Sequence, residues 1–264
     1  MEKGLRHRFS GKIVGNLLRY GGRLLLLFCC IAILSVLLSA GSKLTAGQKH
    51  WREARRDSAQ IAPDPSLTTD AVVHVYAARA WGWRGIFGVH TWIAAKPAGA
   101  DHFHRYEVIG WGSGNGRSVV RIHRNLPPDG FWFGNQPELL TKLRGPAASA
   151  AITAIDQAAK DYPFATRYRV WPGPNSNTFT AYIGRQVPAL RLDLPPTAIG
   201  KDFNGRRWLT LAPSGSGWQF SLYGLFGVLL AVEEGLEVNI LGFAIGIDLN
   251  PPALRLPGVG RLGL

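Results

Sequence analysis

The sequence predicts an α+β protein in which helices pack on an antiparallel sheet, preceded by one N-terminal transmembrane helix. Three observations support this fold class. An uncharged apolar run lies near the N-terminus, and from Asp70 onward short β-branched and aromatic segments are divided by Gly and Pro. Segments with helical spacing follow them. With 264 residues, 32 Gly and 17 Pro, the chain is long enough for a sizeable domain and is unlike a helical bundle.

The apolar run covers residues 24–41 (LLLLFCCIAILSVLLSAG), close to the length that crosses a hydrocarbon core of about 30 Å. Residues 1–23 carry six Lys or Arg residues and a single acidic residue, Glu2. This bias predicts a single-pass inner-membrane protein with a cytoplasmic N-terminus and a periplasmic C-terminal domain. Because the apolar run follows it directly, the basic tail is interpreted as a topology signal and a contact with lipid headgroups, and not as a segment that binds nucleic acid. The alternative is a cleaved signal peptide, because small residues occur at positions 39–41.

Four regions follow from this division: a basic tail (residues 1–23), the anchor (24–41), a juxtamembrane helix and linker (42–69) and an exported α+β domain (70–264). Within the domain, VHTWIAAK and YEVIGWG are typical strand segments, joined by a tight hairpin through Lys96–Gly99. Helical spacing predicts helices over residues 146–162 and 176–187.

Two later apolar runs, residues 222–232 and 238–249, are too short to span a membrane. We expect them to form two buried strands of one hairpin. A hairpin that rests on the membrane is the alternative.

The two cysteines of the chain, Cys29 and Cys30, both lie in the apolar run. Their number and position exclude a disulfide scaffold and a four-cysteine zinc site in the exported part. The glycine-rich segment at residues 112–116 lacks the Lys-Ser/Thr pattern of a phosphate-binding loop. The sequence therefore implies no cofactor.

A nucleophile is predicted where PGPNSNTF, residues 172–179, leads into the second long helix. Asn175 is a good N-cap, and Ser176 lies in the first turn, beside free backbone N–H groups and the positive end of the helix dipole. Backbone N–H groups at Asn177 and Thr178 are candidate donors to an oxyanion. The alternative is that Ser176 has only a structural role at the helix start.

A base is predicted at His90, which opens the strand VHTWIAAK. His102 and His104 share one face of the following strand, because side chains alternate in strands. A metal site is the rival hypothesis: His102 and His104 form an H-x-H pair that His90, Asp101 or Glu107 would complete. We expect no metal, since alternating histidines on an edge strand are more often exposed to solvent.

The segments HTWIAAKP, WPGPNSNTF, LPPTAIGKDF and PPALRLPGVGRLG resemble an uncharacterised bacterial family, the domain of unknown function number 3750, over roughly residues 70–264. That family has no assigned activity. More distantly, the order of strand histidines followed by an Asn-nucleophile helix resembles the circularly permuted papain-like hydrolases, which include the lecithin–retinol acyltransferase group.

This second resemblance implies a permuted papain-like fold, with His90 as the base and His102, or else His104, as the residue that orients it. Ser176 stands where that group has Cys, and a hydroxyl needs full general-base assistance. The implied function is a hydrolase or acyltransferase. The predicted location alone indicates its substrate, an amide or ester of the cell envelope, in peptidoglycan or lipid. Trp92, His104, Lys201 and Asp202 are candidate cleft residues.

The alternative function is a non-catalytic envelope module that binds peptidoglycan, lipid or a protein partner. Its sequence feature is a set of tryptophans that suits either a buried core or an aromatic groove. We expect most of this set in the core: Trp81, Trp83, Trp92, Trp111, Trp132 and Trp171.

Overall fold

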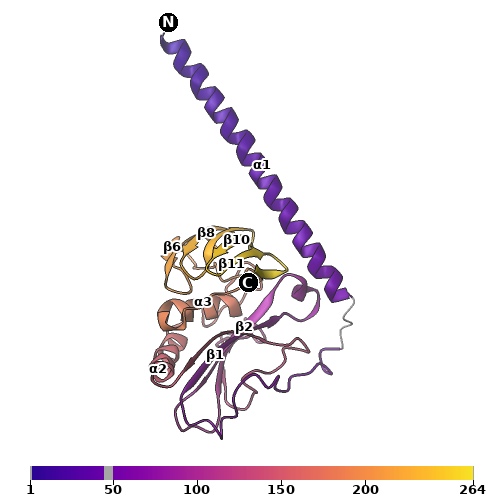
Figure 1. Cartoon of the computed structure of the whole chain (residues 1–264), viewed down its shortest axis with the longest axis vertical. Coiled ribbons are helices and arrows are strands. Elements are labelled where there is room, and N and C mark those ends of the chain that lie inside the picture. Colours follow the sequence, from indigo (N-terminus) through magenta and orange to yellow (C-terminus); the bar gives the residue numbers. More distant parts are fainter. Residues whose placement is uncertain (1, 45–49, 264) are drawn as a thin grey trace.

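The computed structural model describes residues 2–44 and 50–263, and it has one long N-terminal helix attached to an α+β domain (Figure 1). The helix, α1, covers Glu2–Leu44. Its segment Leu18–Gly41 is long and apolar enough to cross a membrane, as the sequence predicts. The C-terminal part of α1 packs on the domain, where the Ser39 hydroxyl donates a hydrogen bond to the Ile86 carbonyl.

The helix expected within residues 42–69 does not occur where the structure describes that region beyond Leu44. Residues 50–69 form turns instead, and residues 45–49 lie outside the described part of the chain. Pro63 and Pro65 oppose a continuous helix here. The segment is held by the buried Asp129 carboxylate, which accepts hydrogen bonds from the N–H groups of Ile61 and Ala62.

The first sheet has five antiparallel strands in the order β4-β3-β2-β1-β5. Helices α2 and α3 cover one of its faces, and both of them confirm the sequence prediction (Figure 1). The element bounds are β1 (Val72–Arg79), η1 (Gly82–Ile86), β2 (Val89–Lys96), β3 (His104–Val108), β4 (Val120–His123), β5 (Glu138–Arg144), α2 (Pro146–Lys160), α3 (Ser176–Gln186) and η2 (Pro188–Leu190).

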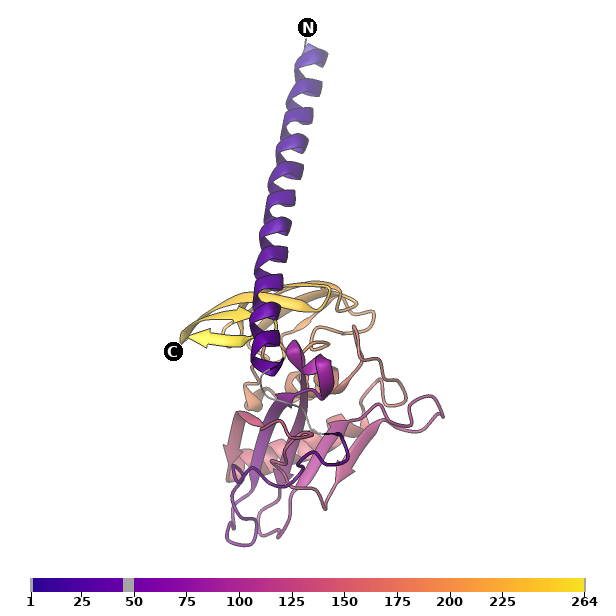
Figure 2. The same ribbon diagram turned by 90° about the vertical axis from the view of Figure 1, so that its right-hand side faces the viewer.

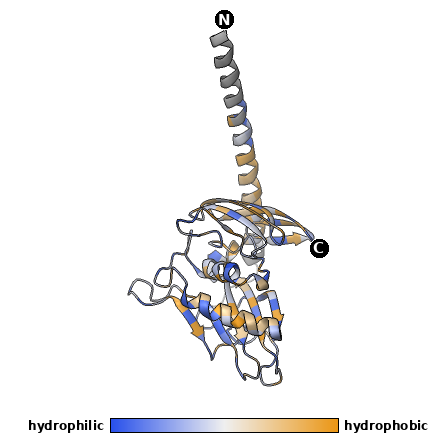
Figure 3. Cartoon of the chain, turned by 90° about the vertical axis from the view of Figure 1, so that its left-hand side faces the viewer, coloured by the Kyte–Doolittle hydropathy of each residue, from blue (hydrophilic) through white to orange (hydrophobic). Residues whose placement is uncertain are grey.

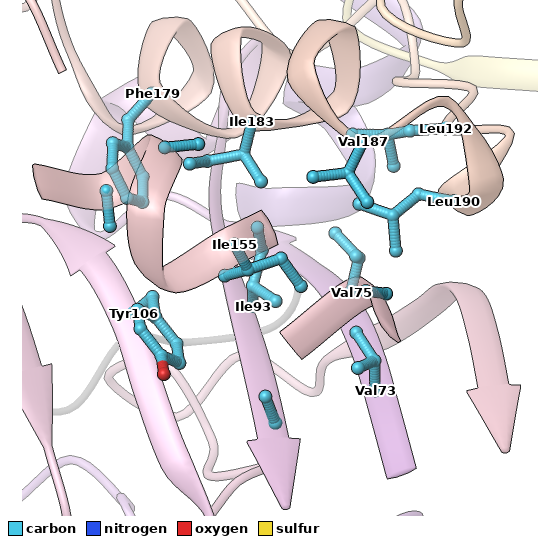
Figure 4. Packing of buried hydrophobic residues seen from close by; sticks show 14 of the residues in the cluster. Val73, Val75, Ile93, Tyr106, Ile155, Phe179, Ile183, Val187, Leu190 and Leu192 are labelled. Atoms are coloured by element: carbon cyan, nitrogen blue, oxygen red, sulfur yellow. The ribbon is translucent and has the colours of Figure 1, made fainter. Parts of the chain in front are cut away.

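The main core lies between this sheet and the two helices (Figure 4). Val75 and Ile93 from the strands meet Ile155 of α2 and Ile183 of α3, and all four side chains are fully buried. The opposite face of the sheet carries a smaller aromatic cluster around Tyr76 and Trp92. This division follows from the alternation of side chains along each strand.

The second sheet is a seven-stranded antiparallel meander in the order β12-β11-β10-β9-β8-β7-β6. Figure 2 shows it lying crosswise to α1. Its strands are β6 (Leu209–Leu211), β7 (Gly217–Leu222), β8 (Phe226–Ala231), β9 (Gly235–Ile240), β10 (Phe243–Leu249), β11 (Pro252–Leu256) and β12 (Gly260–Gly263).

The expectation of one hairpin with two buried strands over residues 222–232 and 238–249 is wrong. Each run contains a turn, so the two runs contribute to four strands, β7 to β10. In the second run the turn is Leu241-Gly242, with φ of 54° and 87°, the positive values that two-residue hairpin turns require. Alternate side chains of these strands are exposed rather than buried.

The inner side of the second sheet buries an ionic network. Glu237 on β9 pairs with the Lys201 ammonium and with the Arg255 guanidinium on β11. Arg255 also binds the Asp193 carboxylate at 2.6 Å, and Lys201 lies 3.5 Å from Asp202. The two positive groups lower the pKa of Glu237 against the opposing effect of burial. The network joins this sheet to the 193–202 segment that follows α3.

We expect Glu237→Gln to destabilise the full chain by about 3 kcal/mol, because it leaves Lys201 and Arg255 buried without their shared anion. The matched control is Glu233→Gln, which breaks the exposed pair with Arg191 and costs at most about 1 kcal/mol. Denaturant unfolding of both variants measures the difference. Equal effects of the two substitutions would contradict a structural role for the network.

Candidate functional site

A cavity of about 1250 Å³ lies among η1, the start of β2, the N-terminus of α3 and the start of β10. Two of the predicted catalytic residues, His90 and Ser176, line it. Asn175 and Asn177 also contribute to its wall. The structure therefore brings the expected base and nucleophile to one cavity, although they lie 86 positions apart in the sequence.

The N-terminus of α3 is fixed by two asparagine side chains. Asn175 is the N-cap: its Oδ1 accepts from the N–H groups of Asn177 and Thr178 at 2.9 and 3.1 Å. The Asn177 side chain donates to the carbonyls of Val89 and Ile199 at 3.0 and 2.8 Å. These bonds join the helix start to β2 and to the loop after the helix. The predicted N-cap is confirmed.

The prediction that the N–H groups of Asn177 and Thr178 are oxyanion donors is wrong, because the cap already uses both. Among the described residues, the Ser176 N–H is the first-turn amide left without an acceptor. The Ser176 hydroxyl likewise has no hydrogen-bond partner in the described part of the chain. Its neighbours hold the helix in place, while Ser176 lies in the cavity wall with its O–H and N–H not used by the cap.

Gly200 shows how closely the following loop approaches this cap. Its φ is +96°, and a Cβ built on it would lie 2.4 Å from Asn175 Nδ2. A side chain at this position would push the cap away from the loop. The Gly200 carbonyl accepts a hydrogen bond from the Thr178 hydroxyl at 2.7 Å, which also fixes the start of the helix to this loop.

His90 is held from two sides. Its Nε2 lies 2.8 Å from Glu107 Oε2 on the neighbouring strand β3. Its ring stacks on Trp132, with centroids 3.6 Å apart and planes 8° apart. Because an ionised carboxylate accepts only, Nε2 carries the proton and Nδ1 carries the lone pair. Nδ1 has no hydrogen-bond partner among the described residues.

Burial lowers the pKa of His90 below its ordinary value of 6.5, against the raising effect of the Glu107 hydrogen bond. The imidazole is therefore neutral at pH 7. Glu107 is almost completely buried, and burial alone would raise its pKa. Its hydrogen bond to His90 and the positive charge of Arg105, 3.0 Å away, outweigh burial and lower the pKa to about 2. At pH 7 the pair thus consists of a neutral imidazole and a carboxylate anion.

The predicted contact of His102 with His90 is not present. His102 lies in the turn before β3, where its ring bonds Asp101 at 2.6 Å and His104 at 3.2 Å. The physical reason is the length of the connection. The tight hairpin expected at Lys96–Gly99 is replaced by a loop over residues 97–103, and β2 pairs with β3 so that Ile93 faces Tyr106. This register brings Glu107 to His90.

The remaining cleft candidates lie outside the cavity wall. Trp92 is fully buried beneath it, with its ring 5.8 Å from that of His90. Lys201 and Asp202 belong to the ionic network under the second sheet. His104 faces away from Glu107 because the two residues are three apart on one strand.

Among the described residues, no group of three or more His, Cys, Asp or Glu side chains is placed to hold a metal ion. The alternation along β3 separates the His102–His104 pair from the His90–Glu107 pair. This arrangement does not favour the metal hypothesis.

The expectation that most of the selected tryptophans are core residues is wrong. Only Trp92 among the six is fully buried, while the others line the cavity. They share its wall with further aromatic residues, and the aromatic lining comprises Trp51, Trp81, Trp83, Phe87, Trp111, Trp132, Phe133, Tyr168, Trp171 and Phe243. Five of the six tryptophans therefore lie where an aromatic groove would have them, and not in the buried core.

Sequence reasoning missed Glu107 as the partner of His90 and considered it only as a metal ligand. It also missed Trp132 as the ring that fixes the imidazole. A usable signal was present for Glu107, because an acidic residue near the end of the strand after His90 is within reach in an antiparallel hairpin. Finding it required the loop length between β2 and β3. Trp132 comes from a distant loop and gave no local signal.

Fold and cavity together define an α+β domain with an aromatic pocket, attached to a helix able to span a membrane. Residues 70–203 match the sequence model of the family described as Protein of unknown function (DUF3750), and the chain belongs to this family. The match includes His90, Glu107 and Ser176 and ends before the second sheet begins. No curated protein and no solved structure matches the chain.

We expect Glu107→Gln to destabilise the protein by about 3 kcal/mol at neutral pH, because it leaves the buried Arg105 guanidinium without its anion. The folded pKa of Glu107, about 2, is below the ordinary 4.5, so its contribution is complete above 4.5 and is lost as the pH falls toward 2. The difference in stability between wild type and variant should therefore shrink in acid.

Thermal unfolding followed over the acid range measures this effect. Glu53→Gln, at an exposed position, is the control and should leave stability unchanged. A Glu107→Gln variant as stable as wild type at pH 7 would refute the strong ion pair.

Proposed function

We propose that the protein is a membrane-anchored serine hydrolase or acyltransferase that acts on an acyl ester or amide of the cell envelope. The observation that carries this proposal is the shared cavity: Ser176 and His90 both line it, and Glu107 fixes the His90 imidazole. The proposal includes the likeness to the permuted papain-like hydrolases. It is supported by a helix that opens after the N-cap Asn175 with Ser176 and docks on β2, whose second residue is His90.

In the proposed reaction, His90 Nδ1 takes the proton of the Ser176 hydroxyl as Oγ attacks the carbonyl carbon of the substrate. The negative charge that develops on the carbonyl oxygen is stabilised by the Ser176 N–H and by the positive end of the α3 dipole. His90 then gives the proton to the leaving alcohol or amine, which departs from the acyl-enzyme. Water or an acceptor alcohol removes the acyl group by the same steps in reverse.

Glu107 has two roles in this scheme. It holds the tautomer that leaves Nδ1 free to accept, and its negative charge stabilises the imidazolium that forms when His90 takes the proton. Ser176 and His90 share no hydrogen bond among those of the described residues, and catalytic hydrogen bonds often tighten only in the substrate complex. The substrate must therefore complete the alignment.

The lining of the cavity favours an acyl chain as the group that is bound. Its walls are mainly aromatic, and its volume of about 1250 Å³ exceeds that of ordinary small-molecule pockets. A lipid ester satisfies both conditions, whereas a peptidoglycan stem peptide would meet few polar partners there. We therefore favour a lipid over peptidoglycan as the substrate.

The proposed location is the inner membrane, with α1 as an uncleaved anchor, its N-terminus in the cytoplasm and the domain in the periplasm. Support comes from the Leu18–Gly41 segment and from the basic residues that precede it. Helix α1 contacts η1 at Ile86, next to the cavity-lining residues Trp83 and Phe87, and this contact supports an anchor close to the cavity. A lipid substrate would be available there.

The second candidate function is a non-catalytic module that holds a lipid chain. It is favoured by the aromatic lining together with serine in place of cysteine at position 176. In this case the cavity binds an acyl chain without cleaving it.

We expect a fluorophosphonate probe to label the full chain at Ser176, so that Ser176→Ala abolishes labelling. His90→Ala should slow it by roughly 10²-fold or more, the usual contribution of a general base. The rate should rise with pH and reach half its maximum below pH 6.5, because the lowered pKa of His90 keeps the base neutral above that point. In-gel fluorescence against time measures the rate.

Ser149→Ala, at an exposed position of α2, is the control and should label like wild type. Labelling that persists in Ser176→Ala would refute this nucleophile. A wild-type chain that does not label at all would leave the lipid-holding module as the function.

The pKa of a thiol placed at position 176 tests, without any substrate, whether His90 accepts a proton from this position. In a Cys29→Ser, Cys30→Ser background, we expect iodoacetamide to alkylate Ser176→Cys with a midpoint below the ordinary thiol pKa of about 8.5. The reason is that His90 Nδ1 takes the thiol proton. Adding His90→Ala should return the midpoint to about 8.5 or higher.

The matched control is Ser149→Cys in the same background, which should titrate near the ordinary thiol pKa whether or not His90 is present. Alkylation rates against pH give the midpoints. A Ser176→Cys midpoint that His90→Ala does not move would show that the two side chains are not a functional pair.

A further inference from the structure

The second sheet has an outer face made of apolar side chains. One row crosses all seven strands through directly paired positions, and each of its members is exposed. Six spacings of about 4.8 Å make this row roughly 29 Å wide. Its members are Leu211, Trp218, Leu230, Leu236, Ile247, Leu254 and Leu262.

The outward positions beside this row are also apolar. Phe220 pairs with Val228, and Val228 pairs with Val238, which extends the apolar surface beside the first row. The outward residues of β7 to β11 include no charged side chain. Soluble monomers rarely expose a continuous apolar patch larger than a few hundred Å². This face therefore requires a covering.

The polar residues of these strands point inward. Gln219, Glu237, Asn239, Asp248 and Arg255 alternate with the outward apolar residues and are buried. The usual arrangement of a half-buried sheet, with apolar residues inside and polar residues toward water, is thus inverted. Such an inversion suits a surface that meets an apolar medium.

The position of α1 identifies that medium. Gly258, in the turn between β11 and β12, lies so close to α1 that a Cβ on it would be 3.2 Å from Val36 Cα. Val36 is five residues before the end of the Leu18–Gly41 segment, which is about 8 Å along the helix axis. The edge of the sheet therefore meets α1 at the depth of a membrane–water interface.

The orientation of the sheet agrees with this depth. Figures 1 and 2 show the second sheet crosswise to α1, on the side of the domain from which the N-terminal part of α1 departs. In Figure 3 the apolar part of α1 lies next to this sheet. Exposed Arg206, Arg207 and Trp208 lie at its β6 edge, and Arg with Trp is typical of residues at lipid headgroups.

We infer that the outer face of the β6–β12 sheet lies on the lipid bilayer, with its apolar side chains at the boundary of headgroups and acyl chains. The inference rests on the part of the proposed function in which α1 is a membrane anchor. It does not depend on catalysis. The protein is then held by two elements, one that crosses the bilayer and one that lies flat on it.

Spin labels test this placement in the full chain, reconstituted into vesicles of phosphatidylethanolamine and phosphatidylglycerol. In the Cys29→Ser, Cys30→Ser background, a nitroxide is attached to Leu230→Cys or to Leu254→Cys, two positions of the same row. Ser149→Cys on α2 is the control, and both variants are checked for folding by circular dichroism. Collisions with oxygen, which enters the bilayer, are compared with collisions with a water-soluble nickel chelate.

We expect the ratio of oxygen to nickel collisions to be several-fold higher at positions 230 and 254 than at position 149. Equal ratios at all three positions would overturn the inference, because the sheet would then face water. Low collision with both reagents, together with spin–spin broadening that dilution with unlabelled protein removes, would overturn it in favour of a second copy of the chain on this face.

A label on the native Cys30, with Cys29→Ser alone, separates this inference from the anchor on which it rests. A bilayer signal at Cys30 and a water signal at Leu230→Cys and Leu254→Cys would refute only the contact of the sheet with lipid. A water signal at Cys30 would refute the anchor itself. Neither result changes the labelling of Ser176, which tests the catalytic proposal independently.

Discussion

The candidate site depends on the hydrogen bonds that fix the N-terminus of α3 against β2. Asn177 spans from the helix start to the Val89 carbonyl, and Thr91 donates to Asn177 Oδ1 at 3.0 Å. Asn175 meanwhile caps the helix and binds the Ile199 carbonyl at 2.9 Å. Because these neighbours are fully engaged, the side chain of Ser176 is the polar group of this turn that remains for the cavity. Local capping thus determines what the cavity contains.

The two sheets bury charge in different ways. Under the first sheet, Glu107 is paired with Arg105 and His90, so one buried anion serves both a cation and a neutral base. Under the second sheet, Glu237 is shared by two cations, Lys201 and Arg255. Breaking such pairs is costly because it leaves a charge in a medium that cannot solvate it. In the first case the carboxylate also fixes the orientation of the His90 imidazole, whereas in the second it joins the sheet to the 193–202 segment.

Local features of the fold could be predicted from the sequence, and features set by distant contacts could not. Helix α3 and its cap were predictable because residues 172–179 contain their own signals: proline before the helix, then asparagine and a hydroxyl. The partner of His90 was not, since the register of β2 and β3 depends on a loop whose length the sequence does not state. A one-residue change of register moves every side chain to the other face.

The second sheet illustrates a further limit. Alternation of apolar and polar residues predicts strands, but it does not say which face is covered by protein. Here Lys201 and Asp193 come from the loop after α3 and supply partners for the polar side, so that side is buried. The folding of the sheet over these charges turns its apolar side outward. Which side of the sheet is buried is therefore determined by charged residues outside the sheet, Lys201 and Asp193.

The cavity reaches the second sheet at the start of β10. This contact connects the proposed lipid substrate with the proposed contact between the sheet and the bilayer. Phe243 contacts Phe87 with ring centroids 6.1 Å apart, and both residues line the cavity. Further along the same strand, Ile247 belongs to the outer apolar row. If that row lies on the bilayer, the cavity begins within one strand length of the acyl chains. Under the proposed function, a lipid tail would reach Ser176 along apolar surface, without a step through water that would cost about 0.8 kcal/mol for each exposed CH₂ group.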